Sequence, residues 1–288
     1  MKYVIAALLV AGSYSKLHCQ KTDETLTRAL VQMTEGFKGQ IGFYIKNLKN
    51  GKVAQYQADT IFPTASIVKI PIMLGIVDKL EKGELQYHQK LVYKDSLLYE
   101  GEDILGSFKH NETIDLSKVL MLMLTTSDNT ASLWLQSLAG TGTRINELLA
   151  KQGLVHTRVN SRTPGREDHR SQYGWGQTTP KEMAQLLQTI VEGSLFNQHA
   201  SSLMLKLLSR NYWDEEALSA IPAGVFVASK NGAVNASRSE VMYVNGPKTP
   251  YLFCLFTKNN VDQSWEPSNE AWQLTRRMSA YVYRYFNK

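Results

Sequence analysis

The stretch Phe62-Pro63-Thr64-Ala65-Ser66-Ile67-Val68-Lys69 opens a long apolar run, with Ile70, Leu74 and Val77 continuing at helical spacing. This pattern predicts a helix that starts near Ser66 and buries one face. A residue three positions along a helix projects from the same face, so Lys69 is within reach of Ser66. A lysine among apolar neighbours is partly desolvated, which lowers its pKa and suits it to act as a base toward the serine hydroxyl.

Two further polar segments can supply the other parts of a nucleophilic site. Ser127-Asp128-Asn129 lies between two apolar helical runs, and Lys230-Asn231-Gly232 follows the strand-like residues 225–228. Ser66 to Lys69 alone could be a serine cap with a solvated lysine, and Ser127-Asp128-Asn129 alone could be a capped turn. Their occurrence together and in this order favours a catalytic interpretation.

The ordered trio resembles the S-x-x-K, S-D-N and K-T-G signature of the class A β-lactamases and, more broadly, of the penicillin-recognising serine hydrolases. The resemblance runs from about Leu26 to Phe286. It implies a serine β-lactamase that hydrolyses β-lactams through an acyl-enzyme, with no cofactor and no metal.

The resemblance also implies roles for individual residues. Ser66 would be the nucleophile, Lys69 its base and Ser127 the relay that passes a proton to the leaving nitrogen. Asn129 would hold the substrate's side-chain amide, and Lys230 with Asn231 would hold its carboxylate. The remaining implied binding positions are Gly232, Ala233, whose backbone N–H would join that of Ser66 in an oxyanion hole, and Arg238 as a second carboxylate ligand.

The chain departs from the family pattern in two places. Asn231 stands where the family has Thr or Ser, so an amide replaces a hydroxyl. In the segment that resembles the family's omega loop, Thr163-Pro164 stands where the family has the Glu-Pro pair that activates the deacylating water. We therefore consider Glu167 as a possible deacylation base, against the alternative that residues 166–168 form a solvated charged loop.

Two other functions use the same acylation residues. One is a penicillin-binding D-alanyl peptidase or esterase that acts on peptidoglycan-like substrates. The other is a β-lactam sensor that is acylated and does not turn over. Tyr99-Glu100, upstream of the second motif, is a candidate lining of the groove, with solvated surface as the alternative.

The coarse pattern predicts an α/β fold of the α+β type. Helix signals cover 22–37 and 268–286, and strand signals cover 41–46, 52–57, 225–230, 240–244 and 251–257. Strands from both ends of the chain predict an antiparallel five-stranded sheet with flanking helices plus an all-helical subdomain. We assign residues 21–288 to one hydrolase domain, its α/β part at about 21–60 and 210–288 and its helical part at about 66–208.

The N-terminus and the composition indicate where the protein works and what it does not bind. A charged start followed by a short apolar core predicts a secretory signal at residues 1–20, hence a secreted or periplasmic protein, and Lys16-Leu17-His18 makes lipid anchoring at Cys19 a poor expectation. The net charge of +6 is not gathered into a basic block, so nucleic-acid binding is not expected. The scattered histidines lack metal-ligand spacing, and we expect a monomer without a membrane span.

Overall fold

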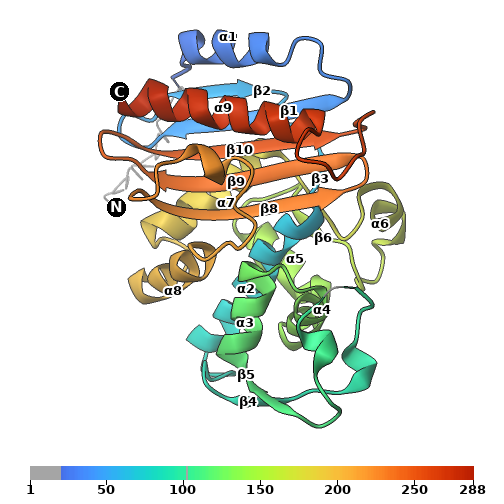
Figure 1. The fold of residues 1–288 in the computed structure, drawn as a ribbon. Helices are drawn as coiled ribbons and strands as arrows, with labels where there is room; N and C mark the ends of the chain where they lie inside the picture. Colours follow the sequence, from blue (N-terminus) through green and yellow to red (C-terminus); the bar gives the residue numbers. More distant parts are fainter. Residues whose placement is uncertain (1–20, 102) are drawn as a thin grey trace, which may run out of the picture.

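A computed structural model describes residues 21–101 and 103–288. The predicted signal at 1–20 and Cys19 lie outside the described residues. Figure 1 shows a sheet with helices on both faces and a mainly helical region below it. None of the helices in the described ranges is long and apolar enough to cross a membrane.

The central sheet is antiparallel, with the strand order β2-β1-β10-β9-β8. A hairpin with its turn at Lys49-Asn50-Gly51 joins β1 to the edge strand β2, and the three strands from the other end of the chain complete the sheet. The antiparallel five-stranded sheet predicted from the sequence is confirmed. The strands are β1 Gln40–Asn47, β2 Val53–Tyr56, β8 Phe226–Val234, β9 Ser237–Asn245 and β10 Pro250–Lys258.

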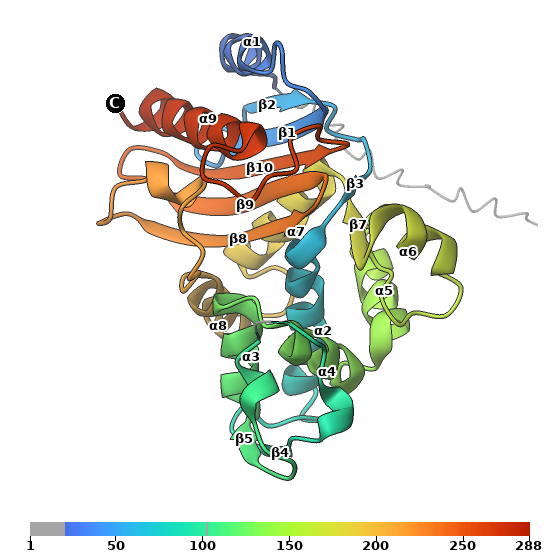
Figure 2. The ribbon, with the colours of Figure 1, turned by 45° about the vertical axis from the view of Figure 1, so that its right-hand side comes forward.

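Two hydrophobic cores lie on opposite faces of this sheet. On one face, α1 Glu24–Met33 and α9 Glu270–Asn287 bury Leu26, Leu274 and Met278 against alternate strand residues such as Phe43 and Phe253. On the other face, α7 Pro180–Glu192 and α8 Gln198–Leu208 join a larger core that continues into the helical region. The view in Figure 2 shows α7 between the sheet and the helical region. Residues 180–208, expected in the helical part, therefore also cover the sheet.

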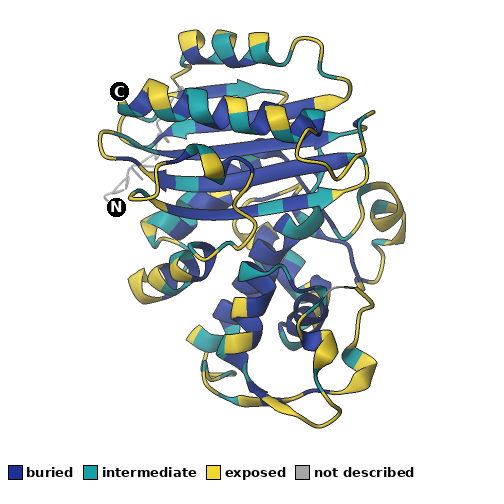
Figure 3. Ribbon diagram, viewed as in Figure 1, coloured by how far each residue is buried: buried dark blue, intermediate teal, exposed yellow. Residues whose placement is uncertain are grey.

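The helical region is built around α2 Lys69–Glu81, whose first ten residues are all buried. Figure 3 shows this helix largely buried and the outer loops largely exposed. The short 3₁₀ segment η1 Ala65–Val68 precedes α2, so the helix predicted to start near Ser66 begins with one tighter turn. Packed against α2 are α3 Leu116–Thr125, α4 Asn129–Leu138 and α5 Thr141–Lys151. The short segments η2 Asp95–Leu97 and η3 Leu105–Ser107 contact α4, and α6 Glu167–Tyr173 lies against β7 Gly176–Thr178.

Small strands connect the two parts of the molecule. A three-stranded sheet of order β3-β7-β6 places the residues just before Ser66 against the residues just before α7. Its strands are β3 Phe62–Pro63, β6 Arg158–Val159 and β7 Gly176–Thr178. A two-stranded pair, β4 Lys90–Val92 with β5 Thr113–Asp115, closes the far end of the helical region, and η4 Leu218–Ala220 leads into β8. Ser66 thus lies where the sheet and the helical region meet.

Candidate active site

Lys69 lies at the centre of the candidate site. Its side chain is fully buried, and Nζ is 3.1 Å from Ser66 Oγ, 2.9 Å from Ser127 Oγ and 2.9 Å from Asn129 Oδ1. Nζ also donates to the Ser127 carbonyl. Burial holds the pKa of Lys69 well below the usual lysine value, and the positive charge of Lys230 lowers it further. The negative charges of Asp103 and Asp128 act in the opposite direction. A neutral amine in contact with Ser66 Oγ can accept the hydroxyl proton.

The backbone around the two serines is held in an unusual conformation. Ala65, next to Ser66, has φ 44° and Ser127 has φ 63°, both in the left-handed region that favours glycine. Ser127 lies in the turn between α3 and α4. Asp128 fixes that turn, because its carboxylate accepts hydrogen bonds from the Ala131 N–H at 2.7 Å and the Leu105 N–H at 2.9 Å. The buried Asp128 therefore positions Ser127 rather than facing a substrate.

Strand β8 supplies the third motif and runs along η1. A Cβ on Gly232 would lie 2.6 Å from the Thr64 carbonyl oxygen and 2.9 Å from the Ser66 backbone nitrogen, so only glycine permits this approach. Lys230 is fully buried, and its Nζ donates to the Asn231 carbonyl at 2.9 Å and lies 3.3 Å from Asn231 Oδ1. Burial lowers the pKa of Lys230 to about 7, with a smaller opposing effect from Glu240.

Two cavities open at Ser66. The first, about 530 Å³, lies toward α6 and β10, and the second, about 430 Å³, lies toward the segment 213–216 and the start of α9. Ser66, Asn129 and Ala233 line both. Ser127, Asn231 and Gly232 line the second, whereas the buried Lys230 lies beneath Asn231 and lines neither. The three sequence motifs, although up to 166 positions apart between Ser66 and Gly232 (232 minus 66), therefore meet at one place.

Arg238 lines neither cavity, and its expected contact with a substrate carboxylate is not what the structure provides. Its side chain is fully buried, and its guanidinium carbon lies 4.4 Å from the ring centre of Trp265 and 4.8 Å from that of Trp272. The guanidinium nitrogens donate to five backbone carbonyls, those of Val234, Asn235, Ser237, Gln263 and Ser264. Arg238 therefore holds the β8–β9 turn and the loop before α9 together, and we leave it out of the proposed binding set.

Glu167 is also placed outside both cavities. It is exposed in the first turn of α6, where Oε1 accepts a hydrogen bond from the Gly165 N–H at 3.2 Å. The loop is instead fixed from inside by Asn160, whose Oδ1 accepts from Arg166 Nε at 3.0 Å and from Nη2 at 2.9 Å. The geometry does not support Glu167 as a base toward an acyl-enzyme at Ser66.

We expect Glu167→Gln to leave steady-state turnover of nitrocefin within about twofold of the parent, because an exposed side chain that caps its own loop contributes little elsewhere. Intact mass spectrometry of samples withdrawn during turnover provides the check. Accumulation of acyl-enzyme in this variant alone would restore Glu167 as the deacylation base.

Several cavity residues were not predicted from the sequence. Tyr99 lines the first cavity as expected and packs edge-on against Trp175 at 5.0 Å, whereas Glu100 lines neither. Trp175, Trp213 and Trp265 come from three loops and Trp272 from the first turn of α9, and they follow no spacing pattern. Only their aromatic character among polar neighbours could have marked them.

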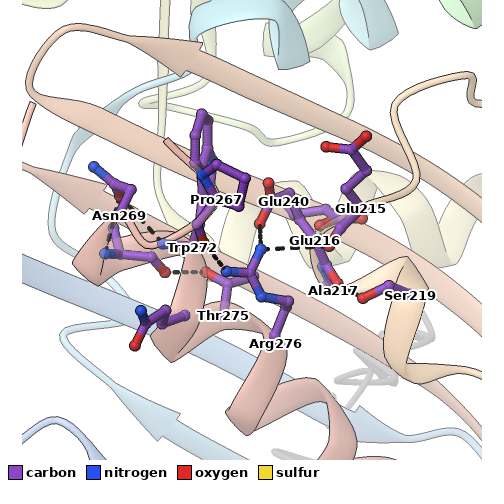
Figure 4. A network of polar contacts seen from close by, with 12 residues as sticks. Glu215, Glu216, Ala217, Ser219, Glu240, Pro267, Asn269, Trp272, Thr275 and Arg276 are labelled. Atoms are coloured by element: carbon purple, nitrogen blue, oxygen red, sulfur yellow. Dashed lines mark hydrogen bonds and ion pairs between the residues drawn. The ribbon is translucent and has the colours of Figure 1, made fainter. Parts of the chain in front are cut away.

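Two buried carboxylates lie close together here, Glu216 in the lining of the second cavity and Glu240 beside it (Figure 4). Glu240, opposite Asn231 on β9, is 1% exposed, and one of its oxygens accepts a 2.6 Å hydrogen bond from the Ala217 N–H. Burial raises the pKa of Glu240 to about 8 and that of Glu216 to about 7, the latter against the charge of Arg276. Within the described residues, no group of three His, Cys, Asp or Glu side chains has a metal-binding arrangement.

Comparison with known proteins identifies the family. Residues 24–286 match the model of the family described as "Beta-lactamase enzyme family". The chain belongs to the beta-lactamase enzyme family. The prediction of a serine hydrolase that acts on β-lactams is thereby confirmed at the level of the family.

Individual relatives are distant in sequence and close in fold. The chain is 24% identical to beta-lactamase BRO-1 of Moraxella catarrhalis, over 86% of this chain and 80% of that protein. It is 22% identical to beta-lactamase VEB-1 of Pseudomonas aeruginosa, over 88% of this chain and 89% of that protein. The solved structure of PBP-A superposes with a TM-score of 0.82 at 23% identity, covering 93% of this chain and 97% of that one. This structural match confirms the predicted fold.

Proposed function

We propose that the protein hydrolyses β-lactams through an acyl-enzyme on Ser66. The observation that supports this best is the contact between the buried, low-pKa amine of Lys69 and Ser66 Oγ at 3.1 Å. Neutral Lys69 takes the hydroxyl proton while Ser66 Oγ attacks the lactam carbonyl carbon. The backbone N–H groups of Ser66 and Ala233 stabilise the oxyanion. They lie close together because Gly232 has no side chain to keep β8 away from η1.

Ser127 completes the proton transfer in this proposal. Its Oγ lies 2.9 Å from Lys69 Nζ and lines the second cavity, so it can receive the proton from Lys69 and pass its own to the leaving nitrogen. Breakage of the lactam C–N bond then leaves a neutral amine and an ester on Ser66. Asn129 borders both cavities and holds the substrate's side-chain amide.

Lys69 is again neutral after this relay, and we propose that it also activates the deacylating water. Among the described residues it is the titratable group in hydrogen-bond contact with Ser66 Oγ. One base then serves both half-reactions, in contrast to the omega-loop Glu implied by the family resemblance. A mutant of PBP-A has been solved as an acyl-enzyme complex with penicillin G, which makes acylation without rapid release the alternative outcome to test here.

Nitrocefin turnover tests the proposed function. We expect continued product formation well beyond one equivalent of enzyme, preceded by a burst if deacylation is the slower step. A single equivalent of product with no further turnover would instead favour the sensor function. Hydrolysis of D-alanyl-D-alanine peptides or depsipeptide esters faster than of nitrocefin would favour the peptidase or esterase.

The charge of Lys230 gives binding a pH dependence. Lys230 is protonated below its pKa of about 7 and neutral above it, while Glu216 gains negative charge through the same range. Both changes weaken binding of a substrate carboxylate as the pH rises. We expect the dissociation constant of benzylpenicillin for the Ser66→Ala variant to rise up to about tenfold between about pH 6 and about pH 8. Calorimetric titration measures it, and a constant or falling value would remove Lys230 from the binding set.

The remaining expectations stay proposals. We propose that the mature protein starts near residue 21, is secreted or periplasmic, and acts as a monomer on a small β-lactam or peptidoglycan-like substrate. Membership of the β-lactamase family supports the extracytoplasmic location. Fractionation of cells that express the whole chain, followed by size-exclusion chromatography with light scattering, tests both points.

A further inference from the structure

The second cavity differs from the first in the kind of side chain that forms its walls. Three tryptophans, Trp213, Trp265 and Trp272, line it together with three carboxylates, Asp103, Glu215 and Glu216. Lysine and arginine are missing from that lining. Indole faces and carboxylates both attract cations, and together they attract quaternary or aromatic cations more than neutral groups.

The tryptophan walls are fixed in place. Trp213 donates from its indole nitrogen to the Thr126 carbonyl at 3.0 Å, which ties the 213–216 segment to the end of α3. The rings of Trp265 and Trp272 pack edge to face with their centres 5.9 Å apart, and both rings contact the Arg238 guanidinium. Trp213 and Trp265 remain 46% and 60% exposed, so ring surface is available to a ligand.

The three carboxylates of the lining differ in the partners that they already have. Glu216 is paired with Arg276 at 3.0 Å, and Asp103 accepts a hydrogen bond from the Thr130 N–H at 2.8 Å. Glu215 is exposed, and its carboxylate has no hydrogen bond or ion pair with any described residue. Figure 4 shows this carboxylate pointing away from Arg276, which contacts the Glu215 backbone carbonyl at 3.5 Å.

The position of the cavity relative to Ser66 indicates which part of a substrate reaches it. Under the proposed function, Ser127 meets the leaving nitrogen and Asn231 lies beside the substrate carboxylate, and both residues line this cavity. In a cephalosporin, the substituent at C3 is attached next to the carbon that carries the carboxylate. That substituent therefore extends toward Trp213 and Glu215.

We propose that the cavity lined by Trp213, Trp265 and Glu215 is a subsite for a cationic C3 substituent, so that the protein favours zwitterionic cephalosporins. This inference rests on the proposed function. The substrate carboxylate stays near Lys230 and Asn231, while the cation lies against the indole faces and the free Glu215 carboxylate. A single substrate thus matches both the positive and the negative ends of the site.

Two cephalosporins with the same 7-thienylacetamido side chain provide the test. Cephaloridine carries a pyridinium arm at C3, and cephalothin carries a neutral acetoxy arm. We expect the ratio of their acylation rate constants, cephaloridine over cephalothin, to fall about fivefold in Glu215→Gln and in Trp213→Leu. Cephalothin acylation should fall less than cephaloridine acylation in both variants.

Glu266→Gln is the matched control, because Glu266 is exposed in the same loop as Trp265 and does not line the cavity. The ratio should stay at the parental value in this variant. An unchanged ratio in Glu215→Gln, or an equal loss for both cephalosporins, would overturn the proposal. Glu215→Gln changes an exposed side chain, so the test does not depend on Trp213→Leu folding.

A second measurement separates this inference from the proposed function. If neither cephalosporin acylates Ser66, the proposed function fails, and the subsite is tested by N-methylpyridinium alone. We expect saturable quenching of tryptophan fluorescence in the parent and in Glu266→Gln, and weaker binding in Glu215→Gln. Unsaturable quenching that is the same in all three proteins would contradict a cation subsite.

Discussion

Replacement of Lys69 by methionine is expected to slow acylation of Ser66 by benzylpenicillin about a thousandfold. The side chain is fully buried with Nζ 3.1 Å from the nucleophile, and burial holds the pKa of the amine well below that of an exposed lysine, which favours its neutral form. Methionine keeps the approximate length of the side chain and removes the base. Stopped-flow measurement of single-turnover acylation gives the rate constant.

The pH profile distinguishes a base from a structural lysine. In the parent, acylation should accelerate as the pH rises through the lowered pKa of Lys69, because only the neutral amine accepts the proton. The methionine variant should lack this rise. Lys79→Met is the control, since Lys79 lies on the same helix and pairs with Glu84 at 3.6 Å, away from Ser66. Equal rates in the parent and Lys69→Met, with both proteins folded, would mean that another group activates Ser66.

Gly232→Ala is expected to lower kcat/KM for benzylpenicillin by about a hundredfold. Its Cβ would lie 2.6 Å from the Thr64 carbonyl oxygen and 2.9 Å from the Ser66 nitrogen, so β8 must move away from η1. That movement separates the two backbone N–H groups proposed to stabilise the oxyanion. The loss should therefore appear in acylation.

Gly224→Ala tests whether the effect is specific to this contact. A Cβ on Gly224 meets no atom within 4 Å, so this variant should keep parental activity and thermal stability. Thermal unfolding of Gly232→Ala shows whether the protein stays folded at the assay temperature. Parental activity in a folded Gly232→Ala protein would mean that the close approach of β8 to η1 is not needed for catalysis.

Much of the fold could be predicted from local sequence patterns. The hairpin around Lys49-Asn50-Gly51 and the three C-terminal strands have strong local signals, and an antiparallel sheet made from both ends of the chain follows from them. The dual role of α7 could not be predicted in this way. Its amphipathic pattern shows that one face is buried, but not that the partner is the sheet rather than another helix.

The site was predictable where motif order carries the information. Ser66, Lys69, Ser127 and Asn129 are linked by the hydrogen bonds of one amine, and Asn231 to Ala233 line the adjoining cavity. Arg238 and Glu167 were different, because a residue type alone does not reveal which way a side chain points. Arg238 is buried against backbone carbonyls and tryptophan rings, and Glu167 caps its own loop in solvent.

The tryptophans of the second cavity could not be predicted as a group from the sequence. Trp213 precedes η4, whereas Trp265 and Trp272 flank the start of α9, and only the folded chain brings them together. Their proposed common role in binding a cation depends on distances in the folded chain that sequence spacing does not encode.

Time-resolved intact mass spectrometry with benzylpenicillin tests the central claim most directly. The account predicts that the parent gains the mass of one benzylpenicillin, that the label maps to Ser66, that it decays as penicilloate is released, and that Ser66→Ala gains no mass. Absence of any adduct in a folded parent that also fails to turn over the drug, or an equal adduct in Ser66→Ala, would contradict the assignment of Ser66 as the nucleophile.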